Sequence, residues 1–172
     1  PANARHICKG GEMRAFIETY FDGKDLAGLR KAITPNWSED VIAAHLRLLD
    51  VPEQARAILE IGCGIGRMLR PLAMPGRVCV GVDASADMIK NALLYCHEFE
   101  NMGFDRIDGD GALPFDVPMF DFVFAWLVFQ HIPDTGAVLR YIDSVYEVLL
   151  SGGIFRFQVL KDDEFPEREL WT

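Results

Sequence analysis

Long apolar runs, closely spaced cysteines and positive charge are all scarce in this sequence. The longest uninterrupted apolar run, residues 122–129, has eight residues, whereas a membrane-spanning helix needs about 20. We therefore expect no membrane span. No charged-then-apolar leader opens the chain, so nothing here indicates secretion.

Metal-binding patterns are also absent. The four cysteines include no C-x-x-C pair, and the four histidines lack metal-ligand spacing. Cys96 and His97 are neighbours, but adjacent side chains on a helix diverge by about 100° and make a poor two-point ligand. We expect no metal, and reduced cysteines in a cytoplasmic protein are the simplest interpretation.

Acidic residues outnumber basic ones. The chain has 26 Asp and Glu against 17 Lys and Arg, for a net charge of −9. A negative net charge of this size repels the phosphate backbone of nucleic acids, so we do not expect nucleic acid to be the main partner. With 172 residues, half of them hydrophobic, the chain is long enough for one globular domain with a substantial core.

The first 50 residues have helical periodicity. Met13, Phe16, Ile17 and Tyr20 recur at helical spacing. A second helix is expected after Trp37, with Ser38 as its N-cap. We expect residues 1–52 to form a helical cap and residues 53–172 to form the core.

From Ala57 onward, strands alternate with helices. The expected strands are residues 57–61, 77–82, 104–108, part of 120–129, and 154–160. The expected helices are residues 65–74, a segment around 89–96, and a long helix that follows Asp134 and ends at Gly152-Gly153. Buried strands separated by single helices predict a doubly wound, Rossmann-like α/β fold, with a parallel sheet and helices on both faces.

The turn after the first strand carries the strongest chemical signal. It has the sequence Glu60-Ile61-Gly62-Cys63-Gly64-Ile65-Gly66. A dinucleotide site has the pattern G-x-G-x-x-G, but here the third glycine comes one residue early and Arg67 fills its usual position. The Glu60 carboxylate would repel a pyrophosphate and favour a cation.

This turn resembles motif I of the class I S-adenosylmethionine-dependent methyltransferases, and the later motifs follow in the family's order. Residues 80–85 resemble the second-strand motif, and residues 109–115 resemble the third-strand turn. Residues 120–132 and 149–153 are similar to the fourth-strand motif and to the turn into strand five. The resemblance covers about residues 37–160 and is nearest to small-molecule methyltransferases, including those of quinone biosynthesis.

The resemblance implies a cofactor, S-adenosylmethionine, with S-adenosylhomocysteine as the product. Asp83 would accept from the ribose hydroxyls, Met88 would cover adenine, Asp110 would accept from the adenine amine, and Glu60 would order the loop. The implied cofactor-binding residues are Glu60, Gly62, Cys63, Gly64, Gly66, Asp83, Ala84, Met88, Asp110, Gly111, Ala112 and Trp126.

Several of these residues have simpler interpretations. The glycines could serve only a tight turn, Asp83 could cap the helix near Ser85, and Glu60 could be a surface carboxylate. Asp108 competes with Asp110 for the adenine role. Cys63 is interpreted as a small neutral filler rather than a nucleophile, and Trp126 and Phe129 as core or pocket wall.

His131 has three open roles: lining the pocket, acting as a general base, or capping locally. Methyl transfer is an in-line displacement that depends more on alignment than on proton chemistry. We list His131 as the one catalytic candidate.

The resemblance also implies a closing pair of strands, six and seven, which residues 161–172 are too short to supply. Strand five would then be an edge; either a second copy of the chain covers it, or the sequence is a fragment that lacks the closing strands. Trp37 and Tyr20 are candidate aromatic residues of a lid. We expect a methyltransferase acting on a small molecule; the alternatives are an S-adenosylmethionine-binding protein without turnover and an NAD(P)-dependent oxidoreductase.

Overall fold

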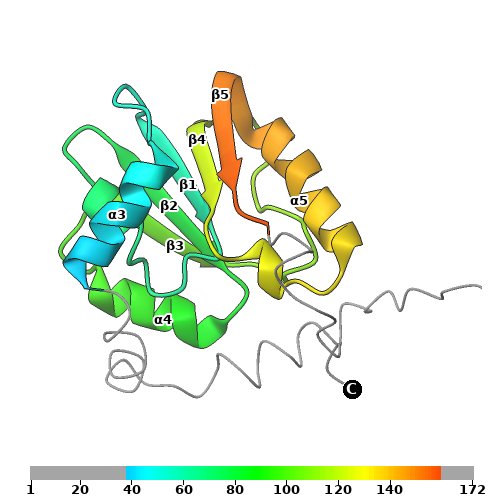
Figure 1. Ribbon diagram of the computed structural model, residues 1–172, viewed down its shortest axis with the longest axis horizontal. Coiled ribbons are helices and arrows are strands. Elements are labelled where there is room, and N and C mark those ends of the chain that lie inside the picture. Colours follow the sequence, from blue (N-terminus) through cyan, green and yellow to red (C-terminus); the bar gives the residue numbers. More distant parts are fainter. Residues whose placement is uncertain (1–37, 160–172) are drawn as a thin grey trace, which may run out of the picture.

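The computed structural model describes residues 38–159 and contains one parallel sheet (Figure 1). Its five strands have the order β3-β2-β1-β4-β5, and all four pairings are parallel. The strands are β1 (Ala57–Ile61), β2 (Val78–Asp83), β3 (Met102–Arg106), β4 (Phe120–Ala125) and β5 (Leu149–Phe157). The helices are α3 (Glu39–Leu49), α4 (Ala86–Tyr95) and α5 (Thr135–Val148).

Helices cover both faces of the sheet. Successive side chains of β1 point to opposite faces, so this strand contributes to two cores. Ile58 packs in one core with Leu49 of α3. Leu59 and Ile61 pack in the other core with Tyr141 of α5. Helix α4 lies on the α3 side (Figure 1). The predicted doubly wound parallel fold is confirmed.

Helix α3 begins as predicted. The Ser38 hydroxyl accepts a hydrogen bond from the Val41 N–H, and Glu39 and Asp40 lie in the first turn, where their charge favours the helix dipole. The predicted helix around residues 13–20 and the lid candidates Tyr20 and Trp37 lie outside the described residues.

The predicted helix at residues 65–74 is wrong. Turns occupy residues 65–69, and the only helical part of this segment is a 3₁₀ turn, Arg70–Leu72. The apolar spacing suggested a helix, but Pro71 has no N–H to donate to the preceding turn and its ring crowds the carbonyl there. The proline therefore stops an α-helix that the pattern alone favoured.

The predicted end of the long helix is also wrong. Helix α5 ends at Val148, and β5 begins at once with Leu149, so Gly152 and Gly153 lie inside the strand. Pairing with β4 causes this early end, because Leu149 pairs with Phe120 across the sheet. Strand β3 also begins two residues earlier than predicted, at Met102.

A carboxylate joins the amino ends of β1 and β4. Asp121 Oδ2 accepts from the backbone N–H groups of Arg56 and Ala57, each at 2.8 Å. The side chain thus supplies the acceptor for two donors where β1 begins. None of the described helices is long and apolar enough to cross a membrane.

We expect Asp121→Ala to lower the free energy of unfolding by about 2–4 kcal/mol, because two N–H groups lose a charged acceptor. Asp121→Asn keeps one carbonyl oxygen and should cost less. The exposed Asp116→Ala is the control, with an expected change within about 0.5 kcal/mol. Urea denaturation measures all three, and equal stability of Asp121→Ala and the control would contradict this role.

Candidate functional site

The candidate site lies at the carboxyl ends of the parallel strands, where ligands of open α/β sheets bind. The loops after β1, β2, β3 and β4 meet at this edge because all the strands run in one direction. The Gly62 and Cys63 N–H groups donate to Val82 O at 2.7 and 3.1 Å, which holds the first loop against β2.

The three glycines of the first loop all have positive φ, but their surroundings differ. A Cβ on Gly62 would lie 2.5 Å from a Val128 methyl, and one on Gly66 would lie 3.0 Å from Phe104. A Cβ on Gly64 would meet nothing within 4 Å. Gly62 and Gly66 therefore permit close packing, whereas Gly64 faces open space where a ligand can approach the backbone.

Asp83, at the end of β2, joins two loops. Its Oδ2 accepts from the Gly64 N–H at 2.8 Å, and its Oδ1 accepts from the Ser85 N–H at 2.9 Å. The N-cap of α4 is Ser85, whose hydroxyl accepts from the Met88 N–H. Asp83 is therefore not the cap of this helix, and its carboxylate lies beside the open position at Gly64.

Glu60 is buried at the end of β1, not a surface carboxylate. It is 3% exposed, and its Oε2 has no hydrogen-bond partner among the described residues. Burial raises the pKa of Glu60 well above its ordinary value and the charge of Asp83 adds to this, while Arg67 and a backbone hydrogen bond from Leu69 oppose it. Loss of solvent thus decides the pKa of this carboxyl group.

Cys63 is buried within the loop and fills space against Gly81 of β2. Its Sγ would lie 2.8 Å from a Cβ on Gly81. Burial raises the pKa of the Cys63 thiol well above its ordinary value, and the charges of Asp83 and Glu60 add to this. A thiol held neutral is a poor nucleophile, which agrees with its interpretation as a neutral filler.

The loop after β3 brings a second carboxylate to this edge. Asp110 is exposed, and its Oδ1 accepts from the Ala112 N–H at 3.0 Å. Gly111 in this loop has φ +102°. Asp110 and Asp83 both lie close enough to Tyr141 to raise the pKa of its phenol, after the larger effect of burial. The structure therefore brings Asp83 and Asp110 near one buried hydroxyl.

Other predicted residues surround this centre. Met88 is buried in the first turn of α4, and Ala84 O accepts from Arg106 Nε at 3.2 Å. Trp126, after β4, donates from Nε1 to His45 Nδ1 of α3 at 2.6 Å. His131 is exposed, in a 3₁₀ turn at Phe129–His131.

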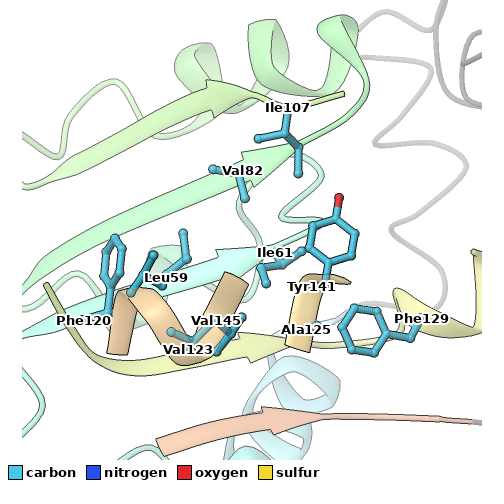
Figure 2. Close-up of a cluster of buried hydrophobic side chains, with 11 residues drawn as sticks. Leu59, Ile61, Val82, Ile107, Phe120, Val123, Ala125, Phe129, Tyr141 and Val145 are labelled. Atoms are coloured by element: carbon cyan, nitrogen blue, oxygen red, sulfur yellow. The ribbon is translucent and has the colours of Figure 1, made fainter. Parts of the chain in front are cut away.

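Sequence reasoning missed residues that support the loops. Figure 2 shows the Tyr141 hydroxyl pointing from α5 toward Val82 and Ile107. Leu127 has φ +59°, an uncommon conformation outside glycine, and its N–H donates to Gln158 Oε1 at 3.2 Å. The sequence places Tyr141 on the apolar stripe of its helix, but no local sequence pattern indicates that the loop after β3 is its neighbour.

Known proteins resemble this chain in sequence. The Methyltransferase domain family matches residues 59–157. The ubiquinone biosynthesis O-methyltransferase of Chelativorans sp. (strain BNC1) is 31% identical over 135 residues, which are 78% of this chain and 49% of that protein. The chain spans about half the length of the curated relatives it matches.

Solved structures resemble it in fold. PH0226 protein from Pyrococcus horikoshii OT3 has 26% identity and a TM-score of 0.60, over 85% of this chain and 64% of that one. Phosphoethanolamine N-methyltransferase 1 of Haemonchus contortus, in complex with phosphoethanolamine and S-adenosylhomocysteine, has 20% identity and a TM-score of 0.68, over 87% of this chain and 33% of that one.

We expect Gly62→Ala to destabilise the protein by about 2–5 kcal/mol, the sum of a positive-φ cost and an overpacking cost. Gly64→Ala has only the first cost, about 1–2 kcal/mol. In a Val128→Ala background the excess cost at Gly62 should shrink, because the clashing methyls are gone. Urea denaturation of the variants measures this, and equal costs at both glycines would contradict the packing account.

The raised pKa of Glu60 predicts a pH effect on stability. At Glu60 the folded state binds a proton more tightly than the unfolded state. The free energy of unfolding therefore falls as the pH rises from the ordinary pKa of 4.5 through the raised pKa of the folded state. Glu60→Gln should therefore remove part of the decline in stability toward neutral pH. Thermal melts of both proteins across this range test it, and identical pH slopes would contradict it.

Proposed function

Because this chain belongs to the Methyltransferase domain family of S-adenosylmethionine-dependent enzymes, we propose that the protein transfers a methyl group from S-adenosylmethionine to a small molecule. The family predicted from the motifs is confirmed. The observation that carries the proposal for this chain is the hydrogen bond from Gly64 N–H to Asp83 Oδ2, at the one glycine of the loop whose Cβ position is open.

The residues at this edge fit S-adenosylmethionine. A carboxylate can accept up to about four hydrogen bonds, so the loop contacts of Asp83 are compatible with acceptance from ribose hydroxyls. Asp110 would accept from the adenine amine, and the buried, unpartnered Oε2 of Glu60 suits the positively charged amino acid end. Gly64 leaves room for the ligand beside its backbone.

When bound, S-adenosylmethionine supplies an electrophilic methyl group on a sulfonium. The chain would contribute alignment, because an in-line displacement gains most from fixed geometry. The first loop is fixed by its contacts with Val82, Asp83 and Val128. His131 is proposed to line the acceptor side of the pocket, where its exposed ring can contact an incoming molecule.

The acceptor class is proposed from the relatives. Similar proteins are named for ubiquinone biosynthesis and for trans-aconitate, and both names indicate small molecules. We further propose that residues 1–52 form a cap over the site and that a second copy of the chain covers the β5 edge. The three described cysteines are free thiols, which supports a cytoplasmic location.

Calorimetric titration with S-adenosylhomocysteine tests the proposal. Asp83→Ala should weaken binding about tenfold to a hundredfold, through loss of charge-assisted hydrogen bonds. Asp116→Ala, an exposed carboxylate before β4, is the matched control and should bind like the wild type. Unchanged affinity of Asp83→Ala would refute the assignment of this residue. Binding without labelled methyl transfer to any of a panel of phenols, acids and quinone precursors would favour a binding protein over an enzyme.

A further inference from the structure

Helix α5 holds the loop after β3 through three side chains, those of Arg140, Tyr141 and Ser144. Arg140 Nε donates to Asp110 O at 2.6 Å, and the Ser144 hydroxyl donates to Gly111 O at 2.9 Å. Tyr141 is 2% exposed, and its phenol oxygen accepts a hydrogen bond from the backbone of Gly111. Arg140 and Ser144 lie on one side of α5 because residues four apart share one side of a helix, and the buried Tyr141 is three residues before Ser144.

The helix also packs against the loop very closely. A Cβ on Gly111 would lie 2.5 Å from Arg140 Cβ and 2.6 Å from Ala137 O. Only glycine fits between the loop and the helix at this position, and Gly111 also has a positive φ that suits glycine. The loop therefore rests directly on the backbone of α5.

Arg140 has a second anchor that fixes its side chain. Its Nη2 donates to Asp134 Oδ2 at 3.2 Å, and Asp134 is the N-cap of α5, where its Oδ1 accepts from Gly136 N–H. One guanidinium thus connects the start of α5 to the carbonyl of Asp110. Glycine at 109 and 111 leaves the loop backbone free to adopt other conformations, so these contacts select one.

We propose that Arg140 is a positioning residue that sets nucleobase specificity, because it holds the Asp110 backbone and so directs the Asp110 carboxylate toward the 6-amino group of adenine. This inference rests on the proposed function. Arg140 does not contact the ligand in this account; it acts through Asp110, with Ser144 as a second support of the same loop.

The test compares two ligands whose purines differ at position 6 and in the hydrogen that the 6-oxo form carries on N1. S-adenosylhomocysteine has an amine there, and S-inosylhomocysteine has an oxygen, which cannot donate to a carboxylate. We expect the wild-type protein to prefer the adenosyl ligand by about tenfold or more in calorimetry. Arg140→Ala should lower this preference about fivefold, and Ser144→Ala should lower it less, because one support of the loop remains. Arg140→Lys should restore part of the preference.

Arg156→Ala is the matched control. Arg156 is also a partly exposed arginine whose Nη2 donates to a carboxylate, Asp50 Oδ2, at 2.8 Å, but it lies on β5, at the opposite edge of the sheet from β3. It should keep the wild-type preference. Thermal melts identify any variant that is not folded at the titration temperature, and Ser144→Ala then supplies the result.

The outcomes separate the inference from the proposed function. No binding of S-adenosylhomocysteine by the wild-type protein would overturn both. Wild-type binding without an adenosyl preference would overturn the inference alone. So would a preference that is unchanged in folded Arg140→Ala, or in Ser144→Ala if Arg140→Ala is not folded. A uniform loss of affinity for both ligands would also overturn it, because a merely structural arginine would weaken them equally.

Discussion

The candidate site depends on one carboxylate, that of Asp83. It accepts from Gly64 N–H in the loop after β1 and from Ser85 N–H at the start of α4. This geometry requires β1 and β2 to be parallel neighbours, with Ile61 opposite Val82. The site therefore depends on the sheet, because the pairing of β1 with β2 brings Asp83 and the glycine loop together at the strand ends. Helix α5 gives the loop after β3 a comparable support from the other face of the sheet.

The same edge contains a group that costs stability. Glu60, near the end of β1, is 3% exposed, and burial raises its pKa well above the ordinary range. A hydrophobic residue there would suit the core better, since a buried carboxyl without full hydrogen bonding is unfavourable. Such an exception to the packing rules is expected at functional sites. In the proposed function, a cationic ligand group would compensate for this cost.

Much of the fold could be predicted because its signals are local. The strand Ala57–Ile61 was predicted with its observed ends, and the Ser38 cap of α3 was confirmed. The errors arose where one residue or one distant pairing outweighed periodicity. Pro71 interrupted the expected helix at residues 65–74, and pairing of Leu149 with Phe120 ended α5 before Gly152. Within the site, the motifs located Gly64, Asp83 and Asp110, whose ligand roles stay predictions. Arg140 was not found, because its contact with Asp110 spans 30 residues of sequence and has no local pattern.

The central claim is that the loops after β1, β2 and β3 form one nucleoside site at the carboxyl edge of the sheet. Amide NMR during titration with S-adenosylhomocysteine tests it most directly, because each backbone N–H reports on its own surroundings. The account predicts that the largest shifts fall in residues 62–66, 83–85 and 109–112, with Gly64 among them. Saturable binding whose shifts fall elsewhere, or an unshifted Gly64 amide, would contradict it.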